Sequence, residues 1–308
     1  MSARAGAIAA AAAITTIAVG AAIAAPPSTT QVDWELASAM SQRRSYIAAA
    51  ELGGLVYAAG GMVGETGRPL HTFARYDPRS DRWLVLPRLP EPTRAAAGAA
   101  VAGAVYVVGG TTPAGNTSAT WAFEPGRQQW SRRASLPAPR FNHAAVALGG
   151  TLYVAGGFLK GRERREVFAF DPAADRWSLV TRLPRPTHAF GLVAFRGELW
   201  VIGGRRGETI LREVWTLDPA DLTWRRGPAL AYPMELLGAA VAGDEIHTVW
   251  ESTYQIYDAG SGRWRQGPRP RVTRHALEAF VVDGALYTVG GCTTALRDSP
   301  VVERLELS

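Results

Sequence analysis

Arginine and histidine recur in this sequence at a spacing near 47 residues, and one glutamate falls among them. In an alignment of the repeated units described below, one position holds Arg44, Thr93, Arg140, Thr187, Met234 and Arg274. The position after it holds Ser45, Arg94, Phe141, His188, Glu235 and His275. Guanidinium groups bind carboxylates and phosphates through paired hydrogen bonds. The two positions together therefore predict a site for an anionic ligand.

The predicted ligand-binding residues are most of these side chains and one arginine from a neighbouring loop: Arg44, Arg94, Arg140, His188, Glu235, Arg274, His275 and Arg205. Glu235 is the carboxylate of the set, and it would be the general acid or base if the site were catalytic. A structural role is the alternative for each arginine, because a guanidinium group also satisfies loop carbonyl groups.

The remaining composition narrows the chemistry. Of the 33 basic residues, Lys160 alone is lysine, so the net charge of +6 and the pI of about 9.8 come from arginine. This excess weakly favours anionic partners. The single Cys292 excludes an intramolecular disulfide and a multi-thiolate metal site, and the five histidines lack metal-binding spacing. We therefore predict no metal and no cofactor.

The first 25 residues have the pattern of a targeting segment. Arg4 is the one charged residue before Asp33, and the uncharged run from Ala5 to Ala25 ends in small residues. This pattern predicts a signal peptide or a membrane anchor over residues 1–25, a linker over 26–31, and export of the remainder to the periplasm, the cell surface or the medium. Export argues against nucleic acid as a partner.

Internal repetition indicates the fold. Paired glycines follow apolar segments at Gly60-Gly61, Gly109-Gly110, Gly156-Gly157, Gly203-Gly204 and Gly290-Gly291. Tryptophan keeps the same phase at Trp34, Trp83, Trp130, Trp177, Trp224 and Trp264. Repeats of this length are typical of solenoids and propellers. The fifth unit has the run 246–251 in place of a glycine pair, so we expect its local structure to differ from that of the other units.

Each unit contains four predicted strands. In the third unit these are Phe141–Leu148, Thr151–Gly157, Glu166–Asp171 and Arg176–Val180, separated by turn residues. Four strands per unit predict a propeller blade. Val32–Ala37 has a tryptophan without three strands before it, and Pro300–Leu307 is a third strand without a fourth. We predict an all-β, six-bladed propeller over residues 32–308, in which the N-terminal strand is outermost in the C-terminal blade.

The repeat resembles the kelch family, whose pattern is a glycine pair, an aromatic-Asp-Pro segment and a tryptophan. Here the last two elements are Tyr76-Asp77-Pro78 with Trp83, Phe123-Glu124-Pro125 with Trp130, Phe170-Asp171-Pro172 with Trp177, Leu217-Asp218-Pro219 with Trp224, and Tyr257-Asp258 with Trp264. The resemblance implies an exported bacterial propeller that acts through binding. The chain is also similar, more weakly, to the six-bladed periplasmic sialic acid mutarotases. Galactose-oxidase-like kelch enzymes require a further domain, for which this chain leaves no residues.

Variable loops are expected on one face of such a propeller, after each glycine pair. Three of them are cationic, through Arg68, then Lys160, Arg162, Arg164 and Arg165, and then Arg205, Arg206 and Arg212. We therefore expect a monomeric, non-enzymatic module that binds an anionic glycan or a protein on this face. The alternative is a mutarotase or epimerase of an acidic sugar, with Glu235 as the acid or base.

Overall fold

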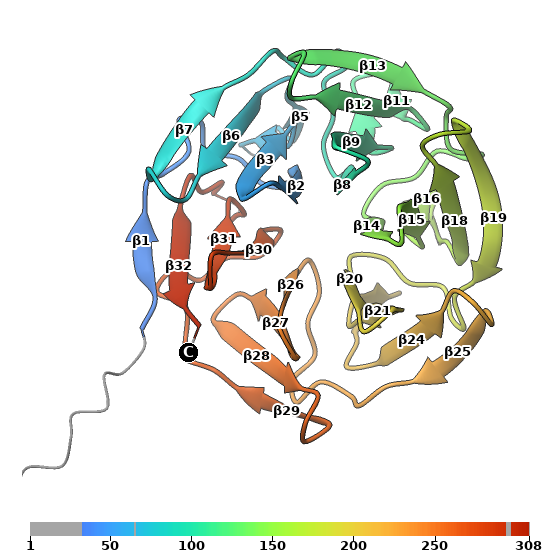
Figure 1. The fold of residues 1–308 in the computed structure, drawn as a ribbon, viewed down its shortest axis with the longest axis vertical. Helices are drawn as coiled ribbons and strands as arrows, with labels where there is room; N and C mark the ends of the chain where they lie inside the picture. The colour runs from blue at the N-terminus through green and yellow to red at the C-terminus, as the bar shows by residue number, and fades with distance from the viewer. Residues whose placement is uncertain (1–32, 65, 294–296, 308) are drawn as a thin grey trace, which may run out of the picture. The chain divides into compact units, whose positions relative to one another are not determined.

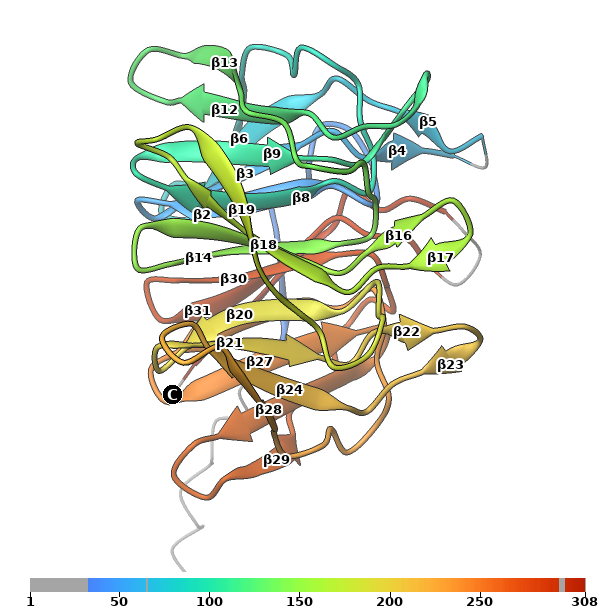
Figure 2. The same ribbon diagram turned by 90° about the vertical axis from the view of Figure 1, so that its right-hand side faces the viewer.

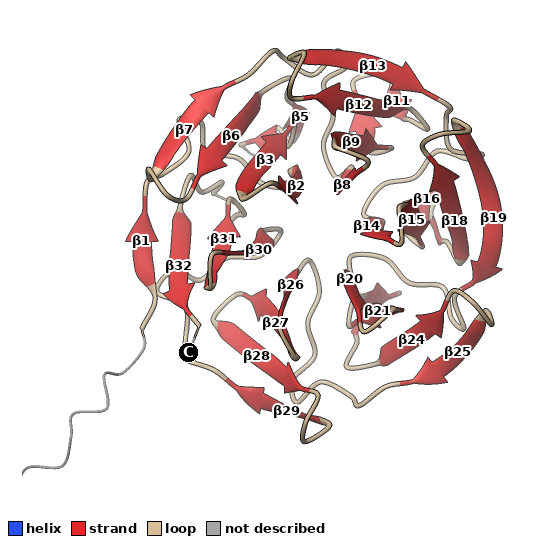
Figure 3. Ribbon diagram, in the orientation of Figure 1, coloured by secondary structure: helices blue, strands red, loops and turns tan. Residues whose placement is uncertain are grey.

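The computed structural model describes residues 33–64, 66–293 and 297–307. This part of the chain forms six four-stranded antiparallel sheets arranged around a central axis, and it contains no helix (Figures 1 and 3). The expected all-β, six-bladed propeller is confirmed. The segment 1–31, for which a signal peptide or anchor and a linker are predicted, lies outside the described residues.

Blades 1 to 3 follow the chain from the inner to the outer strand. Blade 1 contains β2 (Ala48–Leu52), β3 (Leu55–Ala59), β6 (Phe73–Asp77) and β7 (Arg82–Val85). Blade 2 contains β8 (Ala97–Val101), β9 (Ala104–Val108), β12 (Thr120–Glu124) and β13 (Gln129–Arg133). Blade 3 contains β14 (Ala144–Leu148), β15 (Thr151–Ala155), β18 (Glu166–Asp171) and β19 (Arg176–Arg182).

Blades 4 and 5 repeat this order, and blade 6 is built from both ends of the chain. Blade 4 contains β20 (Gly191–Phe195), β21 (Glu198–Ile202), β24 (Val214–Asp218) and β25 (Thr223–Arg226). Blade 5 contains β26 (Gly238–Ala242), β27 (Glu245–Trp250), β28 (Thr253–Asp258) and β29 (Arg263–Gln266). Blade 6 contains β30 (Glu278–Val282), β31 (Ala285–Val289), β32 (Val302–Glu306) and β1 (Glu35–Ala37).

Strand β1 closes the ring, as the sequence predicts. It pairs with β32 in the register Glu35↔Arg304 to Ala37↔Val302. Trp34 precedes β1 and is fully buried, with its indole N–H donating to the carbonyl of Pro268 at 2.8 Å. This contact fixes the first described residues to the connection between blades 5 and 6. Because β1 comes from the other end of the chain, it closes the ring without a disulfide.

The tryptophans join neighbouring blades rather than facing a ligand. The indole N–H of Trp83 donates to Ser38, that of Trp130 to Pro87, and that of Trp177 to Ala134, each at a backbone carbonyl 2.9–3.0 Å away. Each partner lies on the chain before the tryptophan's own blade. In five of the six units the repeated tryptophan is therefore a scaffold residue that links one blade to the preceding connection. The indole N–H of Trp224 has no hydrogen-bond partner in the described chain.

The glycine pairs are required by the space around them. Gly60 has φ of +61°, and a Cβ there would lie 2.4 Å from the carbonyl oxygen of Thr93. Blade 5 lacks such a pair, and β27 runs on to Trp250, which pairs with Thr253 of β28. The predicted local departure of the fifth unit is therefore a tight hairpin without a long loop.

Blades 1 to 4 each carry a small extra hairpin after the glycine pair. These hairpins are β4–β5 (Met62–Val63, Arg68–Pro69), β10–β11 (Thr111–Thr112, Gly115–Asn116), β16–β17 (Phe158–Leu159, Arg162–Glu163) and β22–β23 (Arg205–Arg206, Thr209–Ile210). Figure 2 shows three of them, β4–β5, β16–β17 and β22–β23, projecting from one face. We call this face the loop face.

Candidate functional site

Three of the predicted ligand-binding arginines are buried structural residues. Arg44, Arg140 and Arg274 are at most 1% exposed. The Arg44 guanidinium donates to the carbonyls of Gly60 and Thr72 at 2.9 Å, and that of Arg140 donates to Gly156 at 2.9 Å. Their position in the repeat thus supplies donors to the carbonyl of the first glycine in the pair. These contacts correspond to the structural alternative that the sequence leaves open for each arginine.

Arg274 makes the same contacts and adds a buried ion pair. It donates to Val301 and to the Glu303 carboxylate at 2.8 and 2.7 Å, and it also contacts the carbonyl of Gly290. Glu303 in turn accepts from the backbone N–H groups of Arg271 and Val272. This network ties β32 to the loop that precedes β30.

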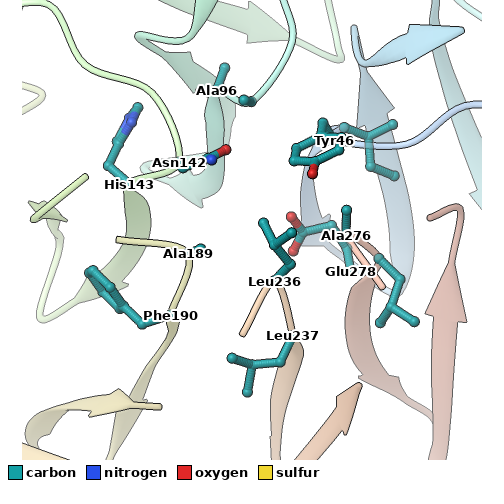
Figure 4. Close-up of a pocket in the computed structure, with 13 residues that line it drawn as sticks. Tyr46, Ala96, Asn142, His143, Ala189, Phe190, Leu236, Leu237, Ala276 and Glu278 are labelled. Atoms are coloured by element: carbon teal, nitrogen blue, oxygen red, sulfur yellow. The ribbon is translucent and has the colours of Figure 1, made fainter. Parts of the chain in front are cut away.

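A closed ring of backbone hydrogen bonds surrounds the axis just inside the loop face. Its members are the residues two positions after the aligned arginines: Tyr46, Ala95, Asn142, Ala189, Leu236 and Ala276. Each donates its N–H to the carbonyl of the member in the preceding blade, at 2.7–3.3 Å, and each has positive φ. The ring joins all six blades and fixes the residues beside it, which form the mouth of the axial channel (Figure 4).

Beside this mouth, a hollow of about 570 Å³ lies on the loop face over blades 3 to 5. We call it the loop-face pocket; its polar and aromatic lining is Tyr46, Asn142, Phe158, Glu163, His188, Arg205, Glu208 and Glu235. Three predicted residues, His188, Arg205 and Glu235, therefore meet here. The hairpins β16–β17 and β22–β23 supply the wall, and Glu235 comes from the connection into blade 5.

Arg205 is the centre of an ion-pair network in this pocket. Its Nη1 is 3.0 Å from Glu235 and its Nη2 is 2.7 Å from Glu208, while its Nε donates to the carbonyl of Gly207. Glu235 is largely buried, whereas Glu208 is almost fully exposed. The Glu208 contact is therefore weak and easily exchanged for a ligand, while the Glu235 contact positions the guanidinium.

His188 lies against an aromatic ring and a carboxylate. Its ring centre is 5.1 Å from that of Phe158, and its Nδ1 is 3.9 Å from Glu163. Burial lowers the pKa of His188, so the imidazole is neutral at pH 7. A hydrogen bond from the Gly207 N–H lowers the pKa of Glu163 and keeps it ionised. The pocket thus places a neutral imidazole beside an ionised carboxylate.

The other two predicted residues lie outside this pocket. Arg94 contacts the Met62 sulfur at 3.5 Å, and within the described residues no carboxylate pairs with it. His275 has its Nε2 3.2 Å from the buried Cys292 sulfur. Burial raises the pKa of Cys292 to about 11, so this thiol is protonated and unreactive at pH 7.

Several of the cationic loop residues are held by their own blades. Arg164 pairs with Glu166 at 2.7 Å and Arg206 with Glu213 at 3.4 Å. Arg165 and Arg212 donate to the backbone carbonyls of Leu183 and Leu230. Most of the loop arginines therefore stabilise the loops, which reduces the anion-binding capacity that the sequence suggests.

Phe158, Glu163, Tyr46 and Asn142 line the pocket without having been selected from the sequence. Phe158 and Glu163 lie in the loop that the sequence identifies as variable, but the arginines of this loop are its more prominent sequence feature. The extra hairpin Phe158↔Glu163 places both side chains beside His188. Two-residue strands have no detectable period in a sequence, so this pairing gave no signal.

The described ranges contain no group of three or more His, Cys, Asp or Glu residues placed to hold a metal ion. In the same part of the chain, no helix has the length and apolar character needed to cross a membrane.

Comparisons with known proteins agree with the fold. The family model for the KLHDC2/KLHL20/DRC7 Kelch-repeats domain matches residues 46–235, which is more than half of the chain. Human Kelch-like protein 33 is 38% identical over 80 residues, or 26% of this chain and 15% of that protein. Mouse Kelch-like protein 35 is 41% identical over 75 residues, or 24% of this chain and 13% of that protein.

The chain thus aligns with only a small part of the length of these relatives. A solved structure titled "Structure of YjhT" superposes with a TM-score of 0.76 at 16% identity, covering 85% of this chain and 95% of that one. At this identity the likeness concerns the fold. Together with the repeat motifs and the six blades, the family match shows that the chain belongs to the kelch-repeat family.

Proposed function

We propose that this kelch propeller is a binding module whose loop-face pocket takes an acidic sugar residue of a glycan. The observation that supports this most is the meeting of Phe158, His188, Arg205 and Glu235 in one hollow. Its volume of about 570 Å³ falls in the range of small-molecule sites, roughly 300–1,000 Å³.

The lining of the pocket suits a polyhydroxylated ring. Glu163 and Glu235 offer carboxylate oxygens as acceptors for sugar hydroxyl groups, and the neutral His188 offers one donor and one acceptor. Phe158 offers an apolar face beside them. A lining that combines hydrogen-bonding groups with an aromatic face favours a sugar over a purely charged ligand.

The arginine of the pocket lining favours a carboxylate on that sugar. Arg205 exchanges the exposed Glu208 for a ligand carboxylate while Glu235 holds its guanidinium in place. Because Glu163, Glu208 and Glu235 make the pocket itself acidic, an anionic sugar depends on Arg205, and a neutral sugar does not.

The test is calorimetric titration of the protein with sialic acid, a uronic acid and their neutral analogues. We expect the acidic sugars to bind, and we expect Arg205→Ala to weaken them at least tenfold. Arg127→Ala is the matched control, because Arg127 is an exposed residue in the turn between β12 and β13. Equal affinity for acidic and neutral sugars would refute recognition of the sugar carboxylate. The absence of any sugar binding would refute the proposal that the pocket binds a glycan.

A mutarotase is the second candidate, favoured by the acid–base groups in the same pocket. Opening a sugar ring requires removal of the anomeric hydroxyl proton and protonation of the ring oxygen. Glu235 and the His188–Glu163 pair are placed to carry these protons. Polarimetry of a freshly dissolved acidic sugar tests this. If the protein leaves the rate of anomer exchange unchanged, the mutarotase is refuted, whereas sugar binding is tested independently by the titration.

A further inference from the structure

Glu278 places a carboxylate inside the axial channel, at a position of the inner strand where the other blades have none. It is the first residue of β30, and the first residues of the other inner strands are Ala48, Ala97, Ala144, Gly191 and Gly238. The scaffold therefore forms without a carboxylate at this level. Figure 4 shows the Glu278 carboxylate pointing into the space between the inner strands.

Within residues 33–64, 66–293 and 297–307, no hydrogen bond or ion pair reaches the Glu278 carboxylate. Burial raises its pKa to about 8, and no nearby charge or donor offsets this effect. Part of the Glu278 side chain is open to the channel, so a ligand can reach the carboxylate. A polar group of this kind without a protein partner commonly marks the place of a bound ion, ligand or water. The position of Glu278 in every hollow section of the channel is consistent with that role.

The channel is hollow on both sides of Glu278. Toward the loop face it narrows to a cavity of about 70 Å³ inside the hydrogen-bonded ring. Toward the opposite face it widens to about 350 Å³, with a largely alanine lining and Glu51 near its end. The wide section is the larger entrance, so a ligand reaches Glu278 from the face opposite the loop face.

The channel lining contains no cationic side chain at neutral pH. The titratable residues that line its three sections are Tyr46, Glu51, His143 and Glu278. Burial lowers the pKa of His143 to about 3 and raises that of Tyr46 to about 12, so both are neutral at pH 7. The lining thus repels anions and attracts cations.

Backbone carbonyls complete the set of acceptors. Each inner strand is the last strand of its sheet, so one of its edges faces the channel without a partner strand. Such an edge presents C=O groups as well as N–H groups. A carboxylate with carbonyl oxygens nearby matches the three N–H donors of an ammonium group, whereas the described chain offers no cluster of metal-binding side chains.

We infer that the axial channel binds the ammonium group of a slender primary amine, with Glu278 as its counterion. The alkyl chain lies against the alanine side chains of the wide section, and the ammonium group reaches the carboxylate. The channel sections that border Glu278 measure only about 70 and 90 Å³, so an unbranched ammonium end fits beside the carboxylate better than a branched or ring-bearing one. This site is separate from the loop-face pocket, and it does not rest on the function proposed for that pocket.

Binding is coupled to the release of a proton near neutral pH. Glu278 is mostly protonated at pH 7 in the free protein and ionised when the ammonium group is bound. The ionised fraction rises about tenfold between pH 6 and pH 7. Tyr46 and His143, which are part of the channel lining, do not titrate in this interval, and Glu51 lies at the rim.

Calorimetric titration of the full chain with n-butylamine and, separately, with calcium chloride tests the inference at pH 6 and 7. We expect butylammonium to bind about tenfold more tightly at pH 7 than at pH 6, with proton release visible as a buffer-dependent heat. Glu278→Ala places at this level the residue type found in other blades, so this variant is expected to fold and to lose the binding. Glu124→Gln is the control and is expected to keep the affinity, because this exposed carboxylate at the end of β12 lies outside the channel lining.

The outcomes separate cleanly. Loss of butylammonium binding in Glu278→Ala and its retention in Glu124→Gln support the inference. Equal binding by the parent protein and Glu278→Ala overturns it, as does the absence of amine binding at millimolar concentration. Calcium binding that depends on Glu278, without amine binding, replaces the ammonium site by a metal site.

Discussion

Replacing Arg274 with methionine should destabilise the propeller at the seam where its two ends meet. The Arg274 Nη2 is 2.7 Å from a carboxylate oxygen of Glu303, and both side chains are at most 1% exposed. Glu303 belongs to β32, which pairs with the closing strand β1. Methionine is compatible with this position of a blade, because blade 5 has the fully buried Met234 there.

The expected loss follows from leaving Glu303 buried without its cation. Removal of one partner of a buried ion pair costs about 3–5 kcal/mol. Glu303 keeps the backbone N–H groups of Arg271 and Val272 as donors, at 2.7 and 3.0 Å, so we expect the lower end, about 3 kcal/mol. With a urea slope of about 3 kcal/mol per molar, the unfolding midpoint should fall by about 1 M.

Urea unfolding followed by tryptophan fluorescence measures this change. The double variant Arg274→Met/Glu303→Gln should lose less than the sum of the single losses, by about 1–3 kcal/mol. Arg79→Met is the control, because its pair with Asp283 is exposed and should leave the midpoint unchanged. A midpoint shift below about 0.3 M for Arg274→Met, or additive losses in the cycle, would refute the view that this pair holds the seam.

Two further changes test the pH response and the backbone. Burial lowers the pKa of His143 to about 3, so the unfolded chain binds the proton more tightly than the folded chain. The free energy of unfolding therefore falls as the pH drops from about 6.5 toward 3. His143→Leu should remove about 3 kcal/mol of that fall by pH 4, and parallel curves of unfolding free energy against pH for the two proteins would contradict this. Gly60→Ala should lower the melting temperature far more than Gly53→Ala. Both glycines have positive φ, but a Cβ would meet the Thr93 carbonyl at Gly60 and open space at Gly53. Equal shifts of the two melting temperatures by calorimetry would contradict the steric reason.

The fold was predictable because its signals recur. The glycine pair occurs where a residue with a Cβ would clash with a neighbouring carbonyl group, as at Gly60. The tryptophan occurs where an indole N–H binds the preceding connection, as Trp83 binds Ser38. Each signal is repeated in phase, so the blades and their closure follow from the sequence. The hairpins such as β16–β17 were not predictable, because two-residue strands have no period.

The arginines show why the site was harder to predict than the fold. Arg44, Arg140 and Arg274 occur at one position of the repeat because a glycine-pair carbonyl needs a donor there. A residue type that recurs with the blades therefore reports a need of the scaffold, even when its chemistry suits a ligand. From the sequence alone, guanidinium groups that bind carbonyls cannot be distinguished from those that bind anions.

Residues that break the repeat are better guides to function in this propeller. Glu278 stands where five blades have alanine or glycine, and its carboxylate has no partner in the described chain. Glu235 is the one carboxylate at its aligned position, and it meets His188 and Arg205 in the loop-face pocket. Since six similar blades can satisfy the scaffold with similar residues, a polar side chain found in one blade alone requires a separate explanation. The loop-face pocket and the axial channel are where this reasoning leads.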